Sequence, residues 1–165
     1  MPPPPAAGPD AAGPPGPRTA FSYRQDPAVP TFADDKPVIV FDGHCVLCSG
    51  WARFVLRQDR RGRFRLLPAQ TPLGRALYLH YGLEPDHYET NILIEDGRPW
   101  LESEGSIRMA EGLGWPWRAG AALRLLPRGW RDSLYRWVAR NRFRLFGRRE
   151  VCYLAEPGHA ERFLG

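Results

Sequence analysis

The chain has 165 residues, of which 43% are hydrophobic, and this is enough for one domain with a buried core. Its formal net charge is +5, and nearly all of the positive charge comes from arginine because Lys36 is the only lysine. No apolar run reaches the roughly 18 residues that a membrane span needs, and no signal-like apolar segment follows the start. We therefore expect a cytoplasmic protein, in which three cysteines are too few for a disulfide scaffold.

The first part of the chain is of low complexity. Residues 1–36 are rich in Pro, Gly and Ala, and such a composition cannot build a core. We predict a disordered tail, in which Phe21, Tyr23 and Phe32 are the candidates for loose packing on the domain.

The next stretch predicts a buried strand that leads into a helix through two cysteines. Residues 38–41 read Val-Ile-Val-Phe, which is typical of a strand buried on both faces. Asp42 and Gly43 follow, and then Cys45 and Cys48 stand at the start of a helical pattern. Cysteines three residues apart in a first helical turn lie on one face and within disulfide range.

This position suggests thiol chemistry. Helix N–H groups and the helix dipole favour a thiolate at Cys45, which is the candidate nucleophile. We expect Cys48, one turn further on, to be more buried and to resolve a mixed disulfide. His44 could add positive charge when it is protonated. Asp42 could cap the helix or relay a proton to Cys48.

Other interpretations of the cysteine pair remain open. A Cys-x-x-Cys pair is often half of a zinc site, and it can also be a structural pair. The strand before it and the amphipathic helix after it favour the redox interpretation. Cys152 stands apart, as a free thiol, a third redox thiol or a remote zinc ligand with a histidine such as His159.

The following elements continue the pattern of an α/β domain. A second strand is expected at residues 64–67 and a second helix from a Thr71 cap to Gly82. Asp96-Gly97 predicts a hairpin between two further strands, and Ser103 can cap a third helix. The element order is strand-helix-strand-helix-strand-strand-helix, which is that of the thioredoxin-like fold, a class of α/β domain.

Two amphipathic helices should follow, over residues 115–126 and about 128–146. The second has an apolar stripe and many arginines; the stripe consists of Trp130, Leu134, Trp137, Val138 and Leu145. We favour a helical extension that packs on the domain with solvated arginines. A membrane-surface contact comes second, and nucleic acid, which we do not expect as a partner, comes last because no base-reading motif accompanies the charge.

Several segments together resemble the DCC family of thioredoxin-like thiol–disulfide oxidoreductases. Residues 42–48 read Asp-Gly-His-Cys-Val-Leu-Cys and fit that family's Asp-x-x-Cys-x-x-Cys signature. The likeness extends to residues 67–77, 92–97 and 135–147. The resemblance implies Asp42, Cys45 and Cys48 as the signature residues and makes the arginine-rich helix a family element.

The chain also departs from ordinary thioredoxins. Those proteins carry a cis-proline before the third strand, whereas this chain has Glu-Thr-Asn at residues 89–91, so substrate docking is expected to differ. Val46 and Leu47 replace the usual Gly-Pro between the cysteines.

The resulting hypothesis is a thiol–disulfide oxidoreductase that acts on a protein or small-molecule thiol or disulfide, without cofactor or metal. The catalytic candidates are Cys45, Cys48 and Asp42, and the supporting candidates are His44, Gly43, Gln70 and Thr90. A non-enzymatic interaction or membrane-peripheral module and a zinc-binding module are the alternatives. The predicted division is a tail (1–36), a thioredoxin-like domain (37–114), helices packed on the domain (115–147) and a second tail (148–165).

Overall fold

The computed structural model describes residues 20–153 and 155–165, which are arranged around one four-stranded sheet. The strands are β1 (Val38–Phe41), β2 (Arg65–Pro68), β3 (Ile92–Glu95) and β4 (Arg98–Trp100), in the order β2-β1-β3-β4. β1 runs parallel to β2, and β3 is antiparallel to both β1 and β4. The connection from β1 to β2 therefore has to cross over through a helix.

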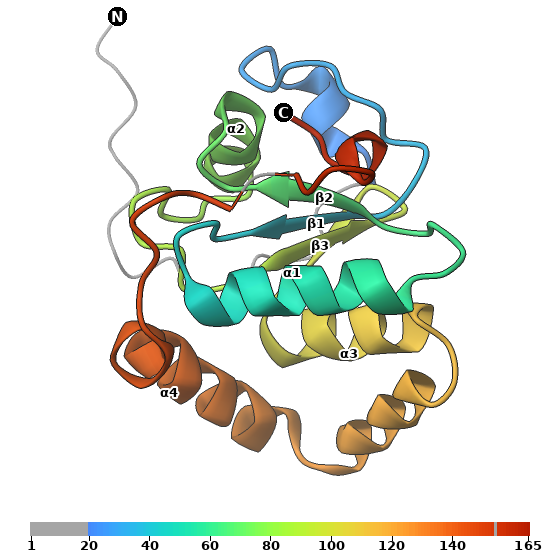
Figure 1. Cartoon of the computed structure of the whole chain (residues 1–165), viewed down its shortest axis with the longest axis vertical. Helices are drawn as coiled ribbons and strands as arrows, with labels where there is room; N and C mark the ends of the chain where they lie inside the picture. Colours follow the sequence, from blue (N-terminus) through green and yellow to red (C-terminus); the bar gives the residue numbers. More distant parts are fainter. Residues whose placement is uncertain (1–19, 154) are drawn as a thin grey trace, which may run out of the picture.

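Three helices cover the two faces of this sheet. These are α1 (Val46–Gln58), α2 (Pro72–His80) and α3 (Glu102–Gly112). Figure 1 shows α1 and α3 on one face and α2 on the other. This arrangement confirms the predicted thioredoxin-like fold.

The continuous apolar character of β1 follows from its central position. Val38 and Val40 pack in the cluster on the α2 side, and Ile39 and Phe41 pack in the cluster on the α1 side. Successive side chains of a strand point to opposite faces, so a strand covered on both faces has to be apolar throughout. β1 is thereby held rigidly, and it carries the residues that follow Phe41 to a fixed place.

Local signals in the sequence fix two other junctions. The Thr71 side chain accepts a hydrogen bond from the N–H of Gly74 at 3.1 Å, and Pro72 opens α2, as predicted. Asp96 and Gly97 both have positive φ, which suits a tight hairpin between β3 and β4. The prediction for Ser103 is wrong, because α3 begins after Leu101 without a side-chain cap and the Ser103 hydroxyl donates to Asp132 instead.

The prediction of an N-terminal tail needs correction for its second half, while residues 1–19 lie outside the described residues. Residues 20–36 include a short 3-10 helix, η2 (Ser22–Gln25), in which Tyr23 is buried against the α2-side core. The Phe32 ring lies 5.2 Å from the Tyr23 ring, centroid to centroid. The three aromatic residues named from sequence thus belong to the domain.

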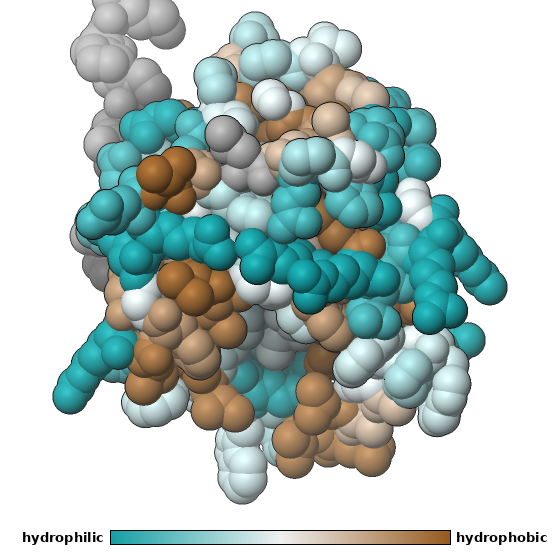
Figure 2. All heavy atoms as spheres, viewed as in Figure 1, coloured by the Kyte–Doolittle hydropathy of each residue, from teal (hydrophilic) through white to brown (hydrophobic). Residues whose placement is uncertain are grey.

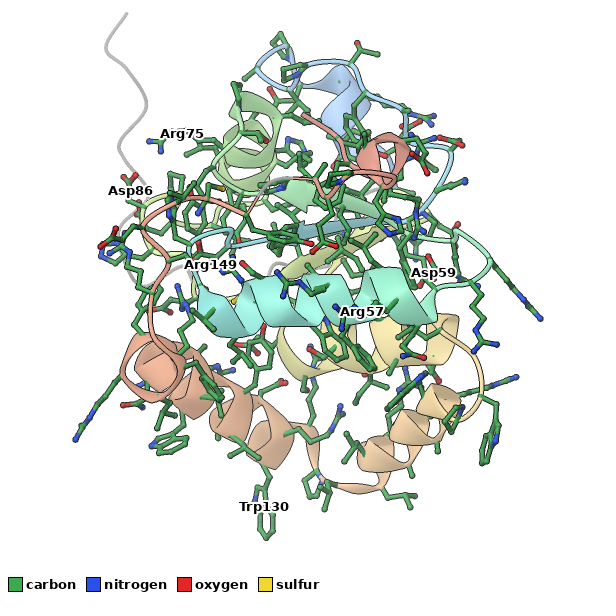
Figure 3. All side chains as sticks on the ribbon, in the orientation of Figure 1. Arg57, Asp59, Arg75, Asp86, Trp130 and Arg149 are labelled. Carbon is green, nitrogen blue, oxygen red and sulfur yellow. The ribbon has the colours of Figure 1, made fainter. Side chains whose placement is uncertain are left out.

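After α3 the chain forms a 3-10 helix, η3 (Trp117–Leu125), and then a long helix, α4 (Arg128–Phe146). α4 packs on α3 and α1, and of its apolar stripe Val138 is half-buried and lines a pocket with residues of α1, whereas most of the stripe is exposed. Trp130 and Trp137 are 74% and 56% exposed, whereas Asp132 and Arg142 are buried. In Figure 3, Trp130 points away from the domain. α4 therefore packs on the domain mainly through polar side chains, and the expectation that its arginines are solvated is wrong for Arg142.

Residues 148–165 do not form a free tail where they are described. Arg148 forms a β-bridge with Cys45, and the Arg149 N–H donates to the His44 carbonyl at 2.7 Å. The chain then reaches η4 (Ala160–Arg162), and the Leu164 N–H donates to the Leu66 carbonyl of β2 at 2.8 Å. The C-terminal segment thus spans the domain from the start of α1 to the outer edge of the sheet (Figure 1).

Candidate active site

Cys45 and Cys48 lie at the N-terminus of α1, directly after the buried strand β1. Cys45 is the N-cap residue of α1, and its Sγ accepts a hydrogen bond from the Cys48 N–H at 3.2 Å. Both cysteines are free thiols in this structure. The sulfur of Cys45 thus occupies the place that an oxygen of Ser or Asp takes at an ordinary helix start.

The surroundings of Cys45 favour its thiolate. The Cys48 thiol donates a hydrogen bond to the Cys45 sulfur, and together with the Cys48 N–H and the Arg142 charge it lowers the pKa of Cys45 to about 7. Burial and the nearby Asp42 oppose this shift. The same hydrogen bond, with burial, raises the pKa of Cys48 far above its usual value. The pair therefore has one acidic thiol and one that keeps its proton.

One source of positive charge at Cys45 was not expected from the sequence. Arg142, from α4, is a cation that lowers the pKa of Cys45. The His44 ring turns to the C-terminal segment, where its Nδ1 lies 3.2 Å from the Arg149 carbonyl oxygen. His44 therefore contacts the C-terminal segment.

Asp42 is buried, and both of its carboxylate oxygens have hydrogen-bond or ion-pair partners. Its Oδ1 accepts from the His44 N–H at 2.9 Å and from the Gln70 amide at 2.6 Å. Its Oδ2 lies 3.3 Å from the Arg142 guanidinium. Asp42 is not the cap of α1, which corrects one of the two roles considered for it; it holds the turn before α1 and anchors Arg142 over the cysteines.

Gln70 and Gly43 connect this turn to the C-terminal segment. The Gln70 Oε1 accepts from the Gly43 N–H at 3.0 Å, and the Cys152 thiol lies 3.7 Å from the same oxygen. A Cβ at position 43 would overlap the Cys152 sulfur, so a side chain cannot be accommodated there. Gly43 permits this close approach.

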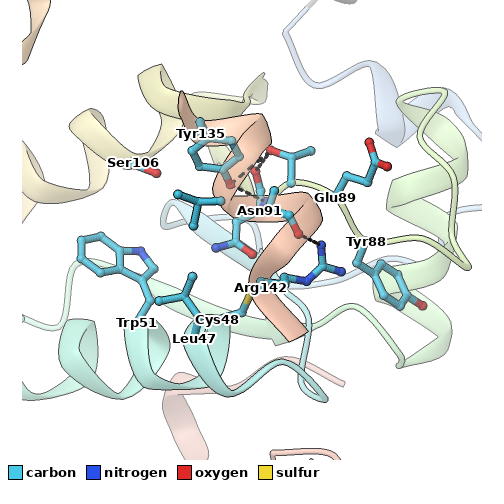
Figure 4. A pocket seen from close by; sticks show the side chains of 12 residues that line it. Leu47, Cys48, Trp51, Tyr88, Glu89, Asn91, Ser106, Tyr135 and Arg142 are labelled. Atoms are coloured by element: carbon cyan, nitrogen blue, oxygen red, sulfur yellow. Dashed lines mark hydrogen bonds between the residues drawn. The ribbon is translucent and has the colours of Figure 1, made fainter. Parts of the chain in front are cut away.

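A small apolar pocket of about 180 Å³ opens beside Cys48 (Figure 4). Its wall includes Leu47 and Trp51 of α1, Thr90 and Asn91 before β3, and residues of α4. Figure 4 shows Cys48 and Arg142 approaching one another from α1 and α4. The pocket gives Cys48 an exposed fraction of 9%, whereas Cys45 is fully covered. The exposed surface therefore does not follow the expected order of burial, although Cys48 is surrounded by more protein atoms than Cys45.

Thr90 and Tyr135 shape the wall of this pocket. The Thr90 hydroxyl accepts the N–H of Glu102 at 3.0 Å, and the Tyr135 hydroxyl accepts the N–H of Asn91 at 3.2 Å. The backbone before β3, where ordinary thioredoxins have their cis-proline, is therefore already bound to α4. Sequence reasoning named Thr90 but missed Tyr135 and Arg142, because nothing in the arginine-rich pattern distinguishes the face of α4 that turns inward.

The zinc interpretation finds no support in the described part of the chain. No group of three or more His, Cys, Asp or Glu side chains among residues 20–153 and 155–165 is placed to hold a metal ion. Cys152 lies over Gly43 on the Gln70 side, as described above.

The fold and the position of the cysteine pair define a thioredoxin-like protein. The chain belongs to the DCC1-like thiol-disulfide oxidoreductase family, whose model matches residues 39–148 and confirms the resemblance seen in the sequence. It is 33% identical to the uncharacterized protein YuxK of Bacillus subtilis over 127 residues, which cover 77% of this chain and 93% of YuxK. It is 34% identical to the chloroplastic DCC family protein At1g52590 of Arabidopsis thaliana over 122 residues, 73% of this chain and 71% of that protein. No solved structure matches the chain significantly.

The acidity of Cys45 can be measured directly. In a Cys48→Ser, Cys152→Ser variant the serine hydroxyl can still donate to Cys45, so the thiolate absorbance should titrate with a midpoint near pH 7. Because the pKa is lowered, the thiolate forms below the usual range of about 8.5 and persists as the pH rises. Cys48→Ala removes the donor and should move the midpoint upward. A midpoint at or above the free-thiol value in the serine variant would contradict the assignment.

Proposed function

We propose that the protein catalyses dithiol–disulfide exchange through Cys45 and Cys48. Membership of the DCC1-like family supports the thiol–disulfide oxidoreductase role in general. The observation that carries the specific mechanism is the position of Cys45 as the N-cap of α1, where its Sγ accepts the Cys48 N–H at 3.2 Å. This environment lowers the pKa of Cys45 to about 7, while Cys48 beside it stays protonated. A thiolate is the attacking species in such exchange, so Cys45 is the nucleophile.

The exchange runs in two balanced steps. The Cys45 thiolate attacks one sulfur of a substrate disulfide, forms a mixed disulfide and releases the other substrate sulfur as a thiolate. The Cys48 sulfur then attacks the Cys45 sulfur and breaks the mixed disulfide, and the Cys48 proton passes to the leaving substrate sulfur. This forms the Cys45–Cys48 disulfide and releases the second substrate thiol. The substrate gains two electrons and the cysteine pair loses them. The reverse sequence oxidises a substrate dithiol.

The role of Asp42 follows from its contacts. Its two oxygens already receive the His44 N–H, the Gln70 amide and the Arg142 guanidinium. This supports a positioning role for Asp42, which keeps Arg142 close to both sulfurs, and not the proton relay that was the other possibility from sequence. Gln70 and Gly43 hold the same turn from its other side.

Access to Cys45 passes through covering segments. The β-bridge with Arg148 and the hydrogen bond between Arg149 and His44 lie over the start of α1, and they leave Cys45 without exposed surface. A substrate disulfide therefore enters beside Cys48, by way of the apolar pocket, and residues 147–149 shift when the mixed disulfide forms. The apolar wall favours protein or small-molecule disulfides with apolar neighbours.

A redox titration tests the proposed function. The Cys152→Ser protein is equilibrated in glutathione buffers of increasing oxidised fraction, quenched in acid, alkylated and analysed by mass spectrometry. We expect one two-electron transition to a Cys45–Cys48 disulfide that reverses on reduction.

Single replacements of Cys45 or Cys48 are the controls and should abolish this transition, while restoring Cys152 should leave it unchanged. Absence of a reversible Cys45–Cys48 disulfide, or stoichiometric zinc in the purified protein, would refute the proposal.

A further inference from the structure

The helix α4 is amphipathic, but it turns mainly polar side chains toward the domain, whereas a helix that packs on a core turns its apolar side chains inward. Its inward face is polar: Asp132 accepts from Ser103, Tyr135 binds the Asn91 backbone and Arg142 pairs with Asp42. The apolar side chains point outward. Because polar residues of α4 make its internal contacts, most of its apolar stripe has no partner in this structure.

The unpartnered side chains form what we call the outer face, which extends from η3 onto α4. Leu125, at the end of η3, is 89% exposed, and Leu134, in the first half of α4, is 64% exposed. Figure 2 shows brown hydrophobic side chains gathered over α4 and over the junction of η3 with α4. The full outer face consists of Leu123, Leu125, Leu126, Trp130, Leu134, Trp137 and Leu145. Exposed apolar surface of this extent marks a contact site.

The charge on α4 itself is almost all positive, and of its exposed arginines Arg140 also lines a pocket with Asp86 and Glu89. Between residues 115 and 147 the only carboxylate is Asp132, which is buried. Among the described residues, no carboxylate pairs with Arg118, Arg140 or Arg144, and all three are exposed. At 100° per residue, Arg140 and Arg144 lie along one side of the stripe that contains Trp137. Unpaired guanidinium groups are suited to bind phosphate, and the exposed indole rings beside them are suited to the boundary between water and an apolar phase.

We propose that the outer face docks on an anionic membrane surface, with α4 lying in the plane of the interface. Arg140 and Arg144 bind lipid phosphates, and Trp130, Leu134 and Trp137 enter the boundary between headgroups and acyl chains. None of the described helices is long and apolar enough to cross a bilayer, so this contact is peripheral.

A second copy of the chain fits the outer face less well. A twofold contact would place the same basic patch against itself, and the one carboxylate of η3 and α4, Asp132, is buried and cannot pair with arginines of the other copy. An anionic bilayer instead supplies phosphates for every arginine. α4 is about 10 Å across, so docking brings the pocket beside Cys48 to about that distance from the headgroups.

Vesicle binding by the full chain tests this proposal. We expect co-sedimentation with vesicles of phosphatidylcholine and phosphatidylglycerol at low salt, weaker binding at high salt, and little binding to phosphatidylcholine alone. Arg140→Gln with Arg144→Gln should weaken partitioning about thirtyfold, since each arginine near an anionic surface contributes about 1 kcal/mol.

Two further variants distinguish docking through the outer face from non-specific attraction of a basic protein to anionic vesicles. Trp130→Ser with Trp137→Ser should abolish the blue shift of tryptophan fluorescence on anionic vesicles. Circular dichroism should show that this variant and the Arg140/Arg144 variant are folded, because all four replaced side chains are exposed. Arg60→Gln with Arg61→Gln removes the same charge from the exposed loop after α1 and should bind like the parent.

Three outcomes would overturn the proposal. These are absence of binding to anionic vesicles at low salt, equal weakening by the Arg60/Arg61 and Arg140/Arg144 pairs, and a dimer that is lost on replacing Trp130 and Trp137 while vesicles are not bound. The readouts do not depend on the cysteines, so a Cys45→Ser protein should bind vesicles normally even if the proposed exchange activity fails its own test.

Discussion

Cys48→Ser is expected to accumulate stable mixed disulfides through Cys45, and Cys45→Ser is expected to accumulate almost none. The reason is the difference in acidity: Cys45 is the thiolate near neutral pH, and Cys48 keeps its proton until it resolves the intermediate. Incubation with a disulfide-bonded model peptide, followed by acid quenching and non-reducing mass spectrometry, measures the trapped fraction. Both variants should carry Cys152→Ser, so that one active-site thiol reports.

The exposed fractions of the two cysteines make this a demanding test. Cys48 is the sulfur that reaches the pocket, so a mechanism governed by access alone would predict trapping through Cys48 in the Cys45→Ser protein. Equal trapping by the two variants, or preferential trapping through Cys48, would reverse the assignment of nucleophile and resolving thiol.

Arg142→Met should lower the free energy of unfolding by about 3–5 kcal/mol, which is typical when one partner of a buried ion pair is removed. Asp42 and Arg142 are 2% and 6% exposed, and the variant leaves the Asp42 carboxylate buried without its cation. The same change removes the positive charge that lowers the pKa of Cys45, so the thiolate midpoint should also rise. Urea denaturation followed by circular dichroism measures the first effect, and thiolate absorbance measures the second.

Matched variants show whether the loss comes from the stranded charge. Arg144→Met changes an exposed arginine on the same helix and should alter stability by no more than about 0.5 kcal/mol. Asp42→Asn combined with Arg142→Met removes both charges and should recover much of the lost stability. If the double variant is as unstable as the single one, the ion pair is not the source of the effect.

The sheet and its helices could be predicted because their signals are local. The apolar run of β1, the Thr71-Pro72 start of α2 and the Asp96-Gly97 turn each act within a few residues, and the structure confirms them. The placement of Cys45 and Cys48 at the start of α1 follows from the same kind of local pattern.

The rest of the site depends on contacts between distant residues. Asp42 and Arg142 are 100 positions apart, and periodicity cannot say which of many arginines turns inward. The sequence also could not say which face of α4 is buried, because hydrophobic periodicity shows that a helix has two faces but not which one meets the domain. The burial of Cys45 was missed for a related reason, since it is caused by residues 148 and 149, far along the chain.

The return of the C-terminal segment to β2 also affects how the protein behaves at high concentration. A sheet has two outer strands, and an open outer strand offers unpaired N–H and C=O groups to strands of other molecules. Here Phe163 forms a β-bridge with Leu66 along β2, and at the opposite side β4 is only three residues long and contains Pro99. Both margins of the sheet therefore discourage strand-to-strand association, and the last few residues protect the molecule against aggregation from one of its two sides.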